Sequence, residues 1–119
     1  MDGQEDAGDA GLAAQGIAVV RPRGRLDLGG LAGLDTALAD AAARHNCCIV
    51  DLSGVTFLAS VGIRSLIHAA RDLHSRGGRM VLLGPSHDVE KVLVVSGVSS
   101  LLPLVHGLDE AVRMAKADG

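Results

Sequence analysis

Short apolar segments alternate with segments of helical periodicity along almost the whole chain, and this alternation constrains the fold more than any other feature. Short, continuous apolar runs suit strands that are buried on both faces of a sheet. We therefore expect strands at 17–20, 47–50 and 80–83, and an edge strand at 101–105 because Pro103 lacks a backbone donor. The alternation predicts an α/β domain with four helices over a mixed, mostly parallel sheet. The predicted helices contain Leu31, Leu34, Leu38 and Ala41; Ile63, Leu66, Ile67 and Ala70; Val89, Val92 and Leu93; and Leu108, Ala111, Val112 and Ala115.

The length and the first residues of the chain predict a single cytoplasmic domain. With 119 residues, the chain is long enough to bury one hydrophobic core. Residues 1–15 have little apolar pattern, so we expect a flexible tail there and one domain over residues 16–119. The first residues are polar and acidic, unlike a signal peptide, and no apolar run is long enough to cross a bilayer.

The composition argues against several classes of function. The formal net charge is -3 and Phe57 is the only aromatic residue, which disfavours nucleic acids and anionic lipids as main partners. Cys47 and Cys48 would point to opposite faces of a strand, so we expect buried free thiols, as in a reducing compartment. Asp27 and Asp51 lie at strand ends, where a carboxylate more often accepts loop N–H groups than acts as a general base.

Motifs that would carry catalysis are missing from the sequence. It has no phosphate-binding loop, no dinucleotide-binding glycine motif and no serine nucleophile elbow. Its histidines show no metal-ligand spacing. The chain is therefore predicted not to be an enzyme and to hold neither a metal nor a cofactor.

The segment around Ser60 carries most of the functional signal. Ser60 lies where the second predicted helix starts, and a serine there commonly caps the helix, which is worth about 1 kcal/mol. Alternatively, Ser60 accepts a phosphoryl group, because the unpaired N–H groups and positive dipole end of a helix favour an anion. The new charge would then act on a docked partner. Gly62 would leave room for that partner. Arg64, one turn further, would shield the phosphate, contact the partner or be a plain surface cation.

Four motifs resemble those of the STAS domain family, in the same order along the chain. The likeness covers about residues 17–116, and it implies the α/β fold that the alternation predicts. The motifs are Gly24-Arg25-Leu26-Asp27; Asp51-Leu52-Ser53 with Ser60 at the following helix start; Gly77-Gly78-Arg79-Met80-Val81-Leu82; and Val89-Glu90-Lys91-Val92-Leu93 with Ser96-Gly97.

Within this family, the chain resembles the bacterial anti-sigma factor antagonists. The resemblance implies that it binds a cytoplasmic anti-sigma factor that is also an ATP-dependent serine kinase, and so frees a sigma factor. Phosphorylation of Ser60 would break this partnership. ATP and magnesium would belong to the kinase, so the chain itself would need no cofactor. The free antagonist is expected to be a monomer.

Two residues beside Ser60 depart from the family pattern: Ala59 replaces the usual Asp, and Val61 replaces the usual Ser or Thr. The alternative function is a STAS subunit of an ABC-type transport complex, such as one for lipids, with the same face docked on the transporter ATPase. A sigma regulator would bind reversibly and respond to negative charge at Ser60, whereas a transporter subunit would stay bound. The expected partner-binding residues are Asp27, Ala59, Ser60, Val61, Gly62 and Arg64.

Overall fold

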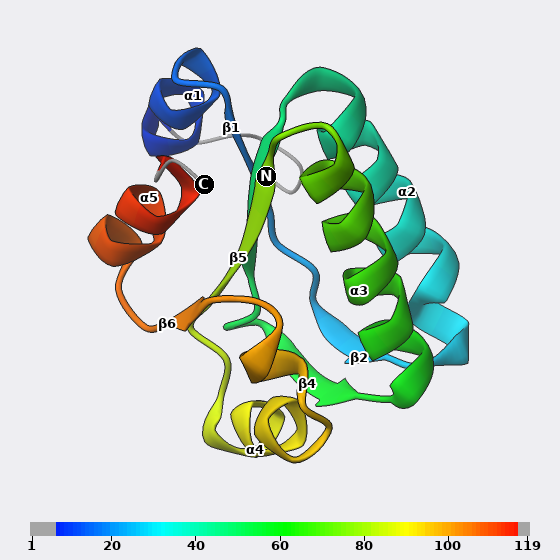
Figure 1. Cartoon of the computed structure of the whole chain (residues 1–119). Helices are drawn as coiled ribbons and strands as arrows, with labels where there is room; N and C mark the ends of the chain where they lie inside the picture. The colour runs from blue at the N-terminus through cyan, green and yellow to red at the C-terminus, as the bar shows by residue number, and fades with distance from the viewer. Residues whose placement is uncertain (1–6, 117–119) are drawn as a thin grey trace.

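The computed structural model describes residues 7–116 and arranges them in layers around a parallel sheet (Figure 1). Strands of the main sheet lie in the order β1-β3-β5-β6, and β2 and β4 form a second, two-stranded parallel sheet. Helices α2 and α3 cover one face of the main sheet, α1 and α5 cover the other, and α4 packs against β4. The predicted α/β class is confirmed, with a fifth helix added at α1. No helix within residues 7–116 is long and apolar enough to span a membrane.

The bounds of these elements follow the predicted alternation closely. The helices are α1 (Ala7–Ala14), α2 (Leu31–Arg44), α3 (Ser60–Ser75), α4 (His87–Val95) and α5 (Leu108–Lys116), with short 3-10 helices η1 (Leu28–Gly30) and η2 (Val98–Ser100). The strands are β1 (Ile17–Val20), β2 (Gly24–Leu26), β3 (Cys47–Asp51), β4 (Val55–Leu58), β5 (Arg79–Leu83) and β6 (Leu104–Val105).

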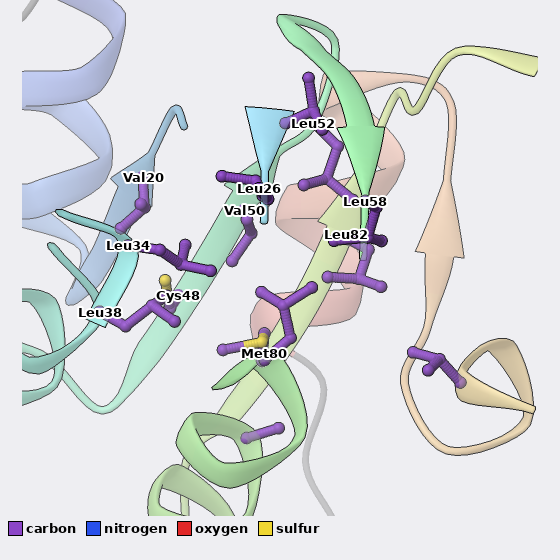
Figure 2. Packing of buried hydrophobic residues seen from close by; sticks show 14 of the residues in the cluster. Val20, Leu26, Leu34, Leu38, Cys48, Val50, Leu52, Leu58, Met80 and Leu82 are labelled. Atoms are coloured by element: carbon purple, nitrogen blue, oxygen red, sulfur yellow. The ribbon is translucent and has the colours of Figure 1, made fainter. Parts of the chain in front are cut away.

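Strands β3 and β5 are buried on both faces, as their continuous apolar runs predicted. Alternate side chains enter two separate cores, because successive residues of a strand point to opposite faces. Cys48 packs toward α2 and α3, whereas Cys47 packs toward α1 and α5, and both cysteines are free, as expected. Burial raises the pKa of the Cys48 thiol to about 12, so it stays protonated. Figure 2 shows the core between the strands and α2, where Leu34 and Leu38 lie beside Cys48.

Helix α1 corrects the expectation of a flexible tail over residues 1–15. Leu12 is buried in the core on the α5 side, and Asp9 is only 9% exposed. Arg21 holds Asp9 with two hydrogen bonds, one of 2.8 Å from Nη2, and also donates from Nε to Asp51 at 3.2 Å. The hydrogen bond to Asp9 is the main reason that the pKa of Arg21 is raised. The alanines and glycines of α1 give no apolar period, so tertiary contacts hold a helix that the pattern does not signal. Residues 1–6, expected to belong to the tail, lie outside the described residues.

Two further expectations differ from the structure. Residues 55–58 were not among the expected strands but form β4, where only Val55 and Leu58 are buried and the apolar pattern is therefore too short to recognise. The edge strand expected at 101–105 is limited to Leu104–Val105. Pro103 still accepts a hydrogen bond from the Leu82 N–H at 2.9 Å, so the segment before β6 runs beside β5 without forming a strand.

Two glycines follow the end of α3 and allow the tight turn into β5. Gly77 adopts a left-handed conformation, with φ of 82°, which glycine tolerates better than other residues. At Gly78 a Cβ atom would lie 1.7 Å from the carbonyl oxygen of Asn46. Glycine at this position therefore lets β5 start directly beside the start of β3.

Candidate functional site

Ser60 is the first residue of α3, at the carboxyl end of β4. Ala59 occupies the cap position in an extended conformation, without a side-chain cap bond, and its N–H donates to the carbonyl oxygen of Leu26 at 3.0 Å. The Ser60 side chain is exposed, and its hydroxyl has no hydrogen-bond partner within residues 7–116. The interpretation of Ser60 as a capping residue is therefore wrong, because the helix starts one residue earlier than a Ser60 cap requires. The Ser60 hydroxyl, without a hydrogen-bond partner within the described residues, therefore lies at the positive end of the helix dipole.

Asp27 lies next to this helix start, because β2 pairs with β4 and ends opposite Leu58. Its carboxylate accepts hydrogen bonds from the Gly29 N–H at 3.1 Å and from Arg25 Nε at 3.1 Å. The hydrogen bond from Arg25 is the main reason that the pKa of Asp27 is lowered, and the Gly30 and Gly29 N–H groups contribute. Asp27 thus holds the loop at η1, as expected for a strand-end carboxylate.

Exposed apolar side chains occur on the two elements next to the start of α3: η1, which follows β2, and β4. Leu28 in η1 is 76% exposed, and Phe57 in β4 is 42% exposed. Arg25 lies over the Phe57 ring, 4.3 Å from its centroid, in cation–π geometry. We define the Ser60 surface as Asp27, Leu28, Phe57, Ser60 and Arg64.

Helix α4, which packs against β4, carries additional exposed valines. Val92 was expected to face inward but is 38% exposed, and Val94 and Val95 are more exposed still. Only Val89 and Leu93 of this helix are buried in the core. The sequence analysis did not select Leu28, Phe57, Val94 or Val95 as functional. The available signals were the single aromatic residue, Phe57, and three valines within residues 92–95. Periodicity alone does not tell which face of a helix stays exposed to solvent.

Gly62 has an internal role, which corrects the expectation that it makes room for a partner. It is buried, and a Cβ atom there would lie 2.9 Å from the Leu26 carbonyl oxygen and 2.9 Å from Leu58 Cδ1. Glycine therefore lets the first turn of α3 pack onto β2, which holds Ser60 beside Asp27. Val61 is half-buried, as is Ala59.

Arg64 lies one turn beyond Ser60, on the same side of α3. Its side chain is exposed and makes no ion pair within residues 7–116. Of the predicted site residues, the structure thus brings Asp27, Ser60 and Arg64 to one surface and leaves Gly62 in the interior. No group of three or more His, Cys, Asp or Glu residues within 7–116 is arranged to hold a metal ion. The geometry offers a hydroxyl acceptor for a phosphoryl group and a partly apolar surface for a protein.

The fold places this chain among α/β domains with helices on both faces of a parallel sheet. The family model of the STAS domain matches residues 13–111, and the chain therefore belongs to the STAS domain family. This confirms the resemblance drawn from the four sequence motifs. No curated protein matches the chain in sequence.

Solved structures with the same fold come from regulators and from transporters. An anti-sigma factor antagonist from Mycobacterium paratuberculosis matches with a TM-score of 0.77 and 24% identity, over 86% of this chain and 87% of that one. The Bacillus cell-fate determinant SpoIIAA in its phosphorylated form matches with a TM-score of 0.64 and 23% identity, over 85% and 92%. A sulfate transporter family protein from Wolinella succinogenes matches with a TM-score of 0.72 and 20% identity, over 85% of each chain. At these identities the likenesses establish the fold.

Proposed function

We propose that this chain is an anti-sigma factor antagonist, which binds a cytoplasmic anti-sigma factor with serine kinase activity and thereby releases a sigma factor. The proposal rests on one observation: an exposed, unbonded Ser60 hydroxyl at the start of α3, flanked by exposed Leu28 and Phe57. The shared fold with antagonists from Mycobacterium paratuberculosis and Bacillus supports it, since the latter has been seen phosphorylated. In this proposal the chain is a cytoplasmic binding protein without catalysis or cofactor of its own, a monomer when free, and the kinase supplies ATP and magnesium.

Phosphorylation of Ser60 would act on the partner more than on the fold. A phosphoserine carries about -1.5 to -2 charges at neutral pH. In the first turn of α3 it would meet unpaired N–H groups and the positive dipole end, a contribution of about 0.3–1 kcal/mol in favour of the folded chain. A partner docked over Leu28 and Phe57 would instead have to desolvate a dianion beside an apolar contact. The complex would therefore weaken while the antagonist stays folded.

Partner capture with Ser60→Asp tests this proposal directly. Three immobilised proteins are incubated with native lysate of the source cells: wild type, Ser60→Asp and the control Thr36→Asp. The control adds the same charge at Thr36, an exposed residue of α2. We expect wild type and Thr36→Asp to retain a serine kinase, identified by mass spectrometry, and Ser60→Asp to bind it at least about tenfold more weakly. Equal retention of the kinase by all three proteins would overturn the switch at Ser60.

The retained kinase should then phosphorylate this chain in the presence of ATP and magnesium. We expect the phosphate on Ser60 by peptide mapping, and no incorporation into Ser60→Ala. Ala59→Asp restores the residue that the family usually has before the serine, so we expect it to raise the rate of incorporation, whereas the Thr36→Asp control leaves the rate unchanged. Phosphate on another residue, with Ser60 unmodified, would contradict the proposal.

The second candidate function is a subunit of an ABC-type transport complex. Two observations favour a role in transport over a phosphoswitch: the fold is shared with a sulfate transporter family protein, and Ala59 and Val61 depart from the usual phosphorylation sequence. In this case the Ser60 surface would dock permanently on a transporter ATPase. Retention of such an ATPase by wild type and Ser60→Asp alike would favour this function over sigma regulation.

A further inference from the structure

A groove of about 530 Å³ lies beside the second half of α3, away from Ser60. It exists because β6 is short and pairs only with Leu82 and Leu83 of β5. The first half of β5 therefore has no strand neighbour on that side within the described chain. The segment at 101–103 runs past it at the other wall of the groove.

The groove combines an apolar lining with basic side chains. Ile67, Leu102 and Pro103 are half-buried and supply apolar surface, and the neighbouring Leu101 is 64% exposed. Arg71 and His74 come from one face of α3, since they are three residues apart, and Arg79 comes from the first residue of β5.

The cations of the groove are not neutralised by the protein. None of the residues that line the groove is acidic, although the whole chain has a net charge of -3. The nearby Asp72 pairs with Arg76 at 3.6 Å, outside the groove. The side chains of Arg71 and Arg79 make no hydrogen bond or ion pair within residues 7–116. The exposed Arg71 and the half-buried Arg79 thus have no acidic partner beside this apolar surface within the described residues.

We propose that this groove binds a small amphipathic carboxylate, such as a medium-chain acyl carboxylate. The carboxylate would sit between Arg71 and Arg79, because guanidinium groups match carboxylates in shape and charge. The acyl chain would cover Ile67, Leu101 and Leu102. The volume of about 530 Å³ lies within the usual range of small-molecule sites. The site is separate from the Ser60 surface, because Ser60 and Arg71 lie eleven residues apart on α3, about 16 Å along the helix.

Titration of the full-length chain by nitrogen–proton correlation NMR tests this proposal. The probes are decanoate, decanol, which has the chain without the charge, and acetate, which has the charge without the chain. We expect decanoate to give saturable shifts at residues 67–80 and 101–103. Decanol should bind about tenfold more weakly, and acetate should give no saturable shift at the same concentrations.

Single charge removals locate the binding groups. Arg71→Gln and Arg79→Gln should each weaken decanoate binding about tenfold while leaving the chain folded, because neither side chain makes a hydrogen bond or ion pair within residues 7–116. Arg113→Gln, an exposed change on α5 at the other face of the sheet, should leave binding unchanged. Equal binding of decanoate by the wild type and both groove variants, or shifts centred on Leu28, Phe57 and Val95, would overturn the proposal. An absence of decanoate binding, together with protection of residues 101–103 by a protein partner, would assign the groove to protein docking instead.

Discussion

Helix α3 contributes to both proposed binding sites: Ser60 is its first residue, and Arg71 in its second half lines the groove together with Arg79 of β5. Both sites would receive an anion, but the helix dipole would favour it only at Ser60, whereas arginine side chains would hold it at the groove. At Ser60 the anion would be attached covalently and received by the helix dipole, with Leu28 and Phe57 beside it. At the groove the anion would be a separate molecule, received by Arg71 and Arg79. The same helix therefore combines an end suited to a covalent switch with an end suited to a reversible ligand.

The first end depends on close backbone packing, which Gly62→Ala would break. The added methyl group would lie 2.9 Å from the Leu26 carbonyl oxygen, so α3 or β2 must shift. We expect a loss of about 1–3 kcal/mol in the free energy of unfolding, measured by urea titration. Gly33→Ala on α2 is the matched control, because nothing lies within 4 Å of its added Cβ atom. The control should gain up to about 1 kcal/mol. A neutral Gly62→Ala would mean that α3 does not rest on β2 in this way.

Serine-to-aspartate substitutions at the two ends of α3 should have opposite effects on the free energy of unfolding, which would sharpen the comparison. Ser60→Asp places negative charge at the start of α3 and should raise the free energy of unfolding by about 0.3–1 kcal/mol. Ser75→Asp places it at the last residue and removes the hydrogen bond from the Ser75 hydroxyl to the Asp72 carbonyl oxygen, 2.7 Å long. We expect it to lower the free energy of unfolding by a similar amount. Urea titrations at low and high salt measure both effects, which should shrink as salt is added. Effects of the same sign would contradict a role for the dipole.

The smallest expected effect is the contribution of Asp27 to the pH dependence of the free energy of unfolding. Its pKa lies below the ordinary value of 3.8 in the folded chain, mainly because Arg25 donates a hydrogen bond to it. The folded state therefore favours the ionised form, and this stabilisation is present above pH 3.8 and lost as pH falls through the folded pKa. The difference in unfolding free energy between wild type and Asp27→Asn should thus be larger at pH 6 than at pH 3. An equal difference at both pH values would show that Asp27 acts without its charge.

The sequence predicted the parts of the fold in which burial follows a long pattern. The runs at β3 and β5 and the apolar spacing of α2 and α3 are long enough to be recognised, and the family motifs span them. Helix α1 was not predicted, because tertiary contacts stabilise it. Arg21 binds Asp9, and Leu12 packs in the core on the α5 side. At the candidate site, Ser60 and Asp27 were found from their positions at a helix start and a strand end. Gly62 was misassigned because its packing against Leu26 depends on the pairing of β2 with β4.

Hydrogen–deuterium exchange of the chain, free and bound to its captured partner, compares the two ends of α3 in one measurement. The proposed function predicts slower exchange on binding at residues 27–30 and 56–64, around Ser60, and unchanged exchange at 71–79 and 101–103. Protection at the groove, with unchanged exchange around Ser60, would contradict the assignment of the Ser60 surface as the partner-binding face.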